Sequence, residues 1–116
     1  MANRFINKKI KLTDTNSTTL FTVPTATTTI IRSILVSEYA GSGSSITVTL
    51  TDSSSVVFNL FTTKTISSNA TTELLTNPLI LQESEILKVQ AGDANRLQVI
   101  MSILEVQPRT VIGGES

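Results

Sequence analysis

The stretch ITVTLT, from Ile46 to Thr51, has apolar side chains at its even positions and hydroxyl side chains at its odd positions. A period of two places one set on the buried face of a pleated strand and the other set toward water. The segment EYAGSGSS, Glu38 to Ser45, precedes it as a loop, and Asp52 to Ser55 follows it as a turn. We therefore predict a half-buried strand that forms a hairpin with Val56 to Thr62.

Further short strands are predicted on both sides of this hairpin. Thr28 to Glu38 is long, Ile86 to Ala91 is shorter, and Arg96 to Val106 is the last. Other strand-like segments are Phe5 to Leu12, Thr18 to Val23, Thr71 to Leu75 and Leu79 to Leu81. About eight to ten short strands without a convincing helix indicate an all-β protein, a single antiparallel β-sandwich of the jelly-roll type.

The length and composition agree with one β domain. A chain of 116 residues can build one hydrophobic core but not two. Its many Thr, Val and Ile side chains are branched at Cβ and suit a pleated surface. We expect residues 1–116 to form one sandwich. Within it, residues 1–17 would be a basic arm or an edge strand, and residues 107–116 a C-terminal tail.

The missing residue types exclude most site chemistry. The sequence has no cysteine and no histidine, which removes thiolate or imidazole metal ligands, cysteine nucleophiles and histidine bases. Nine basic residues balance nine acidic ones, so a nucleic-acid partner is not expected. No apolar run approaches the roughly 18 residues that span a membrane. We predict no catalytic residues, no cofactor, no metal and no enzymatic activity.

Two of the predicted strands carry apolar residues on both faces. In the last strand, Leu97, Val99, Met101 and Ile103 fill one face. A strand in a monomeric sandwich should have one apolar and one wet face. We interpret the second face as an interface with a partner subunit, although a loop or the N-terminal segment of the same chain is an alternative cover. The predicted interface residues are Ile31, Leu35, Ile100, Leu104 and Val106.

Four basic residues, Arg4, Lys8, Lys9 and Lys11, precede the first acidic residue, Asp14. One hypothesis is an arm that binds an acidic surface of another protein through these charges. The alternative is a solvated edge strand whose lysines prevent further strand pairing. Charge alone slightly favours the edge strand.

Two longer stretches add a resemblance. They are LFTVPTATTTIIRSILVSEYAGSGSSITVTL, Leu20 to Leu50, and TELLTNPLILQESEILKVQAGDANRLQVIMSILEV, Thr72 to Val106. Both resemble small β-rich structural proteins of tailed bacteriophages, particularly those of cyanobacteria and other aquatic bacteria. In those proteins a T-V-P turn leads into a hydrophobic strand, and a later T-E-L-L segment leads into the last strand. A Gly is usual near Ser84 in that family.

The resemblance implies a structural role in a virion that is assembled in the cytoplasm of a host bacterium. Its first implication is a capsid decoration, or cement, protein that forms a homo-oligomer, expected as a trimer, and braces major capsid subunits. A neck, tail, baseplate or fibre-attachment component is the alternative within the virion. From another class, a carbohydrate- or receptor-binding module stays open, but the sequence has no Trp and one Tyr, Tyr39.

Overall fold

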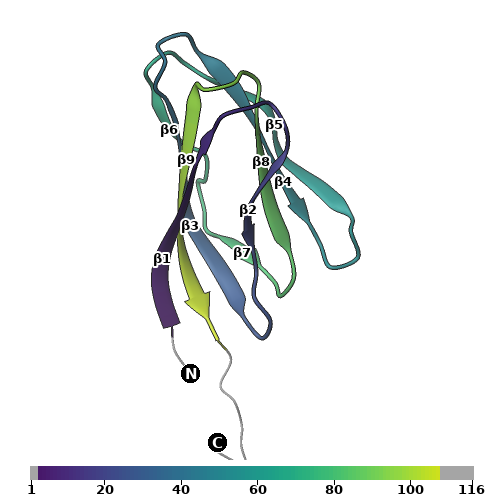
Figure 1. Ribbon diagram of the computed structural model, residues 1–116. Helices are drawn as coiled ribbons and strands as arrows, with labels where there is room; N and C mark the ends of the chain where they lie inside the picture. Colours follow the sequence, from purple (N-terminus) through teal and green to yellow (C-terminus); the bar gives the residue numbers. More distant parts are fainter. Residues whose placement is uncertain (1–2, 108–116) are drawn as a thin grey trace, which may run out of the picture.

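The computed structural model describes residues 3–107, which form nine β-strands arranged as two antiparallel sheets packed face to face (Figure 1). Of the predicted C-terminal tail, residues 108–116 lie outside the described part of the chain, as do residues 1–2. Within residues 3–107 no helix is long and apolar enough to cross a membrane.

The first sheet is ordered β1 (Asn3–Leu12), β9 (Leu97–Val106) and β3 (Thr28–Glu38), followed by two short strands. These short strands, β6 (Thr71–Glu73) and β7 (Leu79–Leu81), pair with the two ends of β3. Pro78 lies between them, and a proline cannot donate to a strand ladder. Together they therefore occupy one strand position at the sheet edge.

The second sheet is ordered β2 (Thr18–Thr22), β8 (Ile86–Ala91), β4 (Ser44–Thr51) and β5 (Val57–Ile66). When β6 and β7 count as one strand position, the chain crosses between the sheets at every step except the β4–β5 hairpin. Two four-position sheets connected in this way form a jelly roll. The predicted fold class, an all-β sandwich of jelly-roll type, is confirmed.

The first and last described strands are neighbours. Asn3 pairs with Val106 and Leu12 pairs with Leu97, so β1 runs antiparallel to β9 along its whole length. Figure 1 shows the described ends of the two strands side by side at one end of the sandwich. The segment predicted as an arm or an edge strand is thus an edge strand over Asn3–Leu12.

The core lies between the two sheets and is almost entirely aliphatic. Alternate residues of the central strands point inward, and Ile34, Val48, Leu87 and Met101 are fully buried. The period of two in the hairpin strand is clearest at its start, because Ile46 and Val48 are fully buried while Thr47 is half-buried, as Leu50 is further along. This core positions both outer faces of the sandwich.

Strand β3 changes faces at a β-bulge. Ile31 pairs with Ile103 but Ser33 pairs with Ser102, so Arg32 is an extra residue opposite β9. An extra residue reverses the alternation of side chains beyond it. As a result Ile31 points inward before the bulge, and Ile34 points inward after it.

The turn between β7 and β8 offers a stabilising substitution. Ser84 has a φ of 70° there, in the left-handed region where a side chain is strained and glycine is not. Ser84→Gly should raise the free energy of unfolding by about 0.5–1 kcal/mol, measured by urea denaturation. The matched control is Ser53→Gly, at an exposed turn residue whose φ is not positive. An equal response of the two variants would contradict the role assigned to φ.

Candidate interaction surface

The outer face of the first sheet carries a row of four apolar side chains, one from each strand position. The register aligns Phe5 of β1 with Leu104 of β9, Leu104 with Ile30 of β3, and Ile30 with Ile80 of β7. Phe5 is 70% exposed and Ile80 is 56% exposed, while Leu104 and Ile30 between them are half-buried. We call these four residues the apolar row. They form a continuous apolar strip, and the exposure of such a strip to water is unfavourable.

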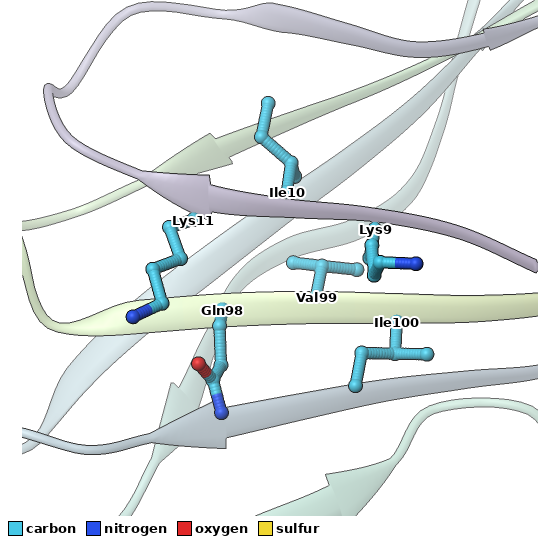
Figure 2. A pocket seen from close by; sticks show the side chains of 6 residues that line it. All are labelled: Lys9, Ile10, Lys11, Gln98, Val99 and Ile100. Carbon is cyan, nitrogen blue, oxygen red and sulfur yellow. The ribbon is translucent and has the colours of Figure 1, made fainter.

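A second row crosses the same face and ends in opposite charges. Lys9 of β1 pairs with Ile100 of β9, Ile100 with Leu35 of β3, and Leu35 with Glu73 of β6. We call these residues the charged row. Ile100 is 40% exposed. Beside it, a shallow groove of about 230 Å³ lies between β1 and β9, and Figure 2 shows its lining side chains.

The outer face of the second sheet is different. Its outward positions on β2, β4 and β5 are mainly Thr and Asn, and those of β8 include Lys88 and Gln90. Exposed apolar residues of this sheet gather instead at the start of β5, at Val56, Val57 and Phe58. One broad face of the sandwich is therefore mainly polar, and the other carries the apolar row.

Four of the five predicted interface residues lie on the outer face of the first sheet. Leu35, Leu104 and Val106 are half-buried there and Ile100 is exposed. The placement of Ile31 on this face is wrong, because Ile31 is 0% exposed and belongs to the core. The cause is the bulge at Arg32, which separates the inward positions of β3 into two sets.

The four basic residues of β1 do not form one basic surface. Arg4 and Lys8 share the alternation of the core-facing residues of β1, whereas Lys9 and Lys11 lie on the outer face. Arg4 donates from Nε and Nη2 to Glu105 Oε1 at 3.2 and 2.7 Å. The Lys8 ammonium lies 5.6 Å from the centre of the Phe21 ring. Of the four residues in the predicted basic arm, only Lys9 and Lys11 therefore lie on the outer face.

Every sheet edge has a feature that discourages the addition of another strand. β1 carries lysines on both faces, β6 and β7 have three residues each, and β2 has five residues with a register shift. β5 pairs with β4 through two register shifts, which twist a strand out of line. Such features oppose edge-to-edge pairing. Contacts between copies are therefore expected from side chains on a sheet face.

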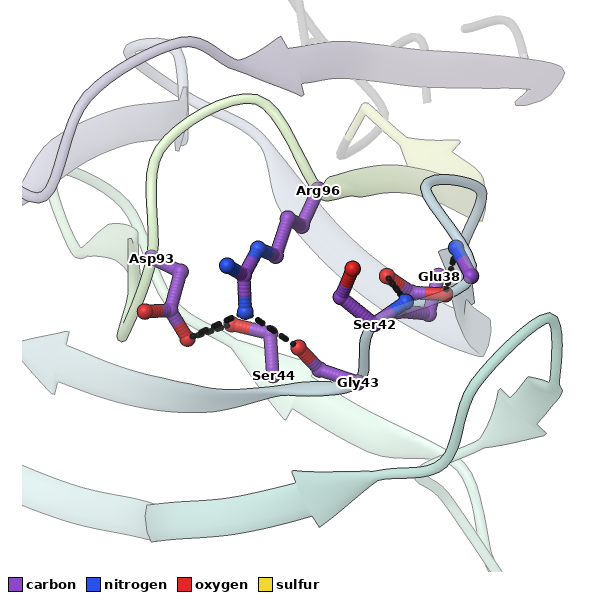
Figure 3. A network of polar contacts seen from close by, with 7 residues as sticks. Glu38, Ser42, Gly43, Ser44, Asp93 and Arg96 are labelled. Carbon is purple, nitrogen blue, oxygen red and sulfur yellow. Dashed lines mark hydrogen bonds and ion pairs between the residues drawn. The ribbon is translucent and has the colours of Figure 1, made fainter.

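A buried carboxylate organises the loops at one end of the sandwich. Glu38, 1% exposed, accepts hydrogen bonds from the amides of Gly41, Ser42 and Asn69 at 2.9, 3.2 and 2.8 Å. Figure 3 shows it reaching under the loop that follows β3. The Asn69 amide most strongly lowers the pKa of Glu38, and the other two amides add to this against the opposing effect of burial. The carboxylate is thus a structural anchor that joins two loops.

A second polar group lies at the same end. The Arg96 guanidinium donates to the Gly43 carbonyl at 3.0 Å and lies 3.5 Å from the Asp93 carboxylate (Figure 3). Ser44 donates to the same Asp93 oxygen at 3.0 Å. These contacts tie the β8–β9 turn to the start of β4. Both charges therefore have partners within the fold.

Glu73 also bonds within the fold. It accepts hydrogen bonds from the Ser33 hydroxyl and from the amides of Ile34 and Leu75, at 2.8 and 3.2 Å for the amides. Burial raises the pKa of Glu73, but these three donors outweigh it and hold the pKa below its usual value. In the described part of the chain no group of three or more Asp or Glu side chains is placed to hold a metal ion.

Comparison with known proteins finds similar folds but no matching family. No family model matches the sequence, and no curated protein matches it. The structure is similar to a chain of the Bacillus endospore appendages, a family of disulfide-linked pili, with a TM-score of 0.55 and 6% identity over 92% of this chain and 88% of that one. It is also similar to a chain in the structure of the infectious bursal disease virus Gx strain, with a TM-score of 0.57 and 10% identity.

The viral match covers 97% of this chain but 33% of the viral chain, so this chain spans about a third of that protein's length. A third match is to a chain of the cyanophage Pam1 capsid asymmetric unit, with a TM-score of 0.47 and 14% identity over 91% of this chain and 85% of that one. At these identities the first two likenesses show a shared fold. That fold occurs in a pilus chain and in a chain of a virus.

Proposed function

We propose that this chain is a non-enzymatic structural subunit of a tailed-phage virion that self-associates through the outer face of its first sheet. Its specific role would be that of a capsid decoration protein, which binds the outer shell and braces neighbouring major capsid subunits. The observation that carries the proposal is the apolar row, because it lies on the outside of a sandwich whose core is already complete. Fully burying an exposed side chain of this kind favours association by about 1.5–3 kcal/mol, and the half-buried Leu104 and Ile30 contribute a part of that.

The chemistry of the chain supports a binding role. The chain lacks Cys and His, and its remaining candidates for acid–base catalysis are carboxylates, lysines and Tyr39. Glu38 and Glu105 are buried and bonded within the fold, and Glu73, although exposed, accepts hydrogen bonds from its own sheet. The virion setting is supported by the sequence resemblance and by the jelly-roll fold that the chain shares with a viral chain.

Contacts with the capsid would be separate from contacts between copies. The proposed capsid-binding element is the loop from Glu38 to Ser45, whose residues 39–42 are exposed. Because the chain has no cysteine, its copies would join without disulfides. Weak contacts repeated over a capsid lattice add up through effective concentration, so no single contact needs to be strong.

Copy number in purified particles tests the proposal. The protein would be quantified by mass spectrometry against the major capsid protein of the phage that encodes it. A count close to that of the capsid protein supports the decoration role. A count that is a small fraction of that of the capsid protein would indicate a component of the neck, tail, baseplate or fibres. Absence from particles would overturn the virion function and reopen a receptor-binding role.

A further inference from the structure

We infer that the outer face of the first sheet is covered by a second copy of this chain, related by a two-fold axis that runs parallel to the strands between β9 and β3. This inference rests on the proposed function, because it takes that face as the surface of association. It adds which molecule covers that face and how this molecule is oriented. It also replaces the trimer implied by the sequence resemblance with a pair.

The charged row is self-complementary under this rotation. The axis exchanges β1 with the β6 and β7 position and exchanges β9 with β3. Lys9 then faces the partner's Glu73, and Ile100 faces the partner's Leu35. Both ends of the row meet the opposite charge, and both apolar positions meet apolar positions. An axis across the strands would instead place β1 against β1, and such an axis along the charged row would bring Lys9 against the partner's Lys9.

The apolar row is matched by the same rotation. Phe5 faces the partner's Ile80, and Leu104 faces the partner's Ile30. Between the two rows lies a polar band that includes Ser102 and Ser33, and Arg32 extends from it so that its guanidinium lies 6.0 Å from the centre of the Phe5 ring. This band would remain hydrated, as parts of many interfaces are.

The size of the face agrees with a stable pair. Strands about 4.8 Å apart with a rise of about 3.4 Å per residue make this face about 19 Å wide and about 34 Å long, or roughly 650 Å² per copy. Two copies would bury about 1,300 Å², which falls in the range of about 1,200–2,000 Å² for specific complexes. Sheets that pack face to face keep their strands within about 30° of one another, which suits an axis parallel to the strands.

Cross-linking between engineered cysteines tests the axis, because the natural chain has no cysteine that could react. Lys11 and Thr71 lie at opposite ends of one row across the face, and both are exposed. A mixture of Lys11→Cys and Thr71→Cys proteins, treated with a bis-maleimide of about 10 Å reach, should give covalent dimers, because sheets pack about 10 Å apart. Each protein alone should not. Cross-linking of Lys11→Cys with itself would overturn the parallel axis.

Mass and charge provide independent readouts. Light scattering of the full chain should give the mass of two copies, and a mass of three copies or of one copy would overturn the pair.

Lys9→Glu should weaken the dimer on the order of tenfold, because it opposes two Lys9–Glu73 contacts at once. Lys64→Glu, the same change on β5, should leave the dimer unchanged. A normal dimer for Lys9→Glu would overturn the arrangement.

The two proposals fail in distinguishable ways. If Lys11→Cys cross-links with itself, the outer face still associates and the proposed function stands without this axis. If the chain is a monomer in solution yet abundant in particles, the face is covered by another virion protein, and the second copy is excluded as occupant. If it is a monomer and absent from particles, both proposals fail.

Discussion

A protein with lysine in place of Ile31 should fail to fold, whereas one with lysine in place of Leu104 should fold normally and lose its association. Ile31 is 0% exposed and surrounded by the core. An unpaired ammonium there costs several kcal/mol, a large part of the roughly 5–15 kcal/mol that stabilises a domain. Leu104 lies on the outer face, where a lysine reaches water in the monomer.

The effect of Leu104→Lys on association should be large. Full burial of such a side chain is worth about 1.5–3 kcal/mol, and Leu104 is already half-buried in the monomer, so each copy loses roughly half of that. A pair therefore loses about 1.5–3 kcal/mol, or on the order of tenfold to a hundredfold in dissociation constant. Analytical ultracentrifugation measures this loss, and circular dichroism checks the fold. Ile100→Lys should behave in the same way.

The control for both variants is Thr22→Lys, at an exposed residue of β2 on the opposite face. It should change neither fold nor association. An unfolded Leu104→Lys protein would mean that Leu104 belongs to the core. A folded Ile31→Lys protein would contradict the bulge at Arg32, because it would place residue 31 on the outer face.

Replacing Glu38 should be the most damaging change to a polar residue. Glu38→Ala leaves three loop amides without their acceptor, and buried unsatisfied donors are strongly destabilising. We expect the melting temperature to fall by roughly 5–10 °C, measured by calorimetry. Glu38→Gln should fall between this variant and the natural chain, since one amide oxygen remains as an acceptor. The control is Glu83→Gln, at an exposed turn residue, which should leave the melting temperature unchanged.

Acid should lower the stability of the protein through the same carboxylate. The pKa of Glu38 is lowered in the folded protein from its ordinary value of 4.5. Its contribution to stability is therefore complete above that value and is lost as the pH falls through the folded pKa. The natural chain should lose stability below about pH 4.5, and Glu38→Gln should lose less over the same interval. Glu73, whose pKa is also lowered, should account for part of the remaining dependence. Equal acid sensitivity in the two proteins would rule out Glu38 as a source.

The strands of the sandwich could be predicted because their residues alternate between apolar and polar. Thr28 to Glu38 and Leu79 to Leu81 have the predicted bounds, and Ile46 to Thr51 lies within β4. β5 extends to Ile66, beyond the predicted Thr62, because two register shifts interrupt its period of two. A pattern that assumes one residue per step cannot anticipate an inserted residue.

The same limit explains the error at Ile31. The sequence TTIIRSILVSE has apolar residues at both odd and even positions, so either set can face inward. The bulge uses one set before Arg32 and the other set after it. Only the pairing with β9 fixes this choice, and that pairing joins segments far apart in the sequence.

Three members of the outer face escaped prediction for a related reason. Phe5, Ile30 and Ile80 are separated by long stretches of chain and become neighbours of Leu104 through the strand register. The alternation within β1 does carry a signal, because Ile6, Ile10 and Leu12 share one parity and so predict an inward face. That parity separates Arg4 and Lys8 from Lys9 and Lys11, which argues against a single basic arm.

The pairing of β1 with β9 has a kinetic consequence. The first sheet has its opening strand beside its closing strand, with nearly the whole chain between them. During synthesis the ribosome releases β1 long before its partner exists, so this sheet is completed after translation of residue 106. Topologies dominated by such distant pairings fold in about milliseconds to seconds, rather than microseconds. Until that closure, the nascent chain exposes the edge of an unfinished sheet and depends on its lysines to stay apart from its neighbours.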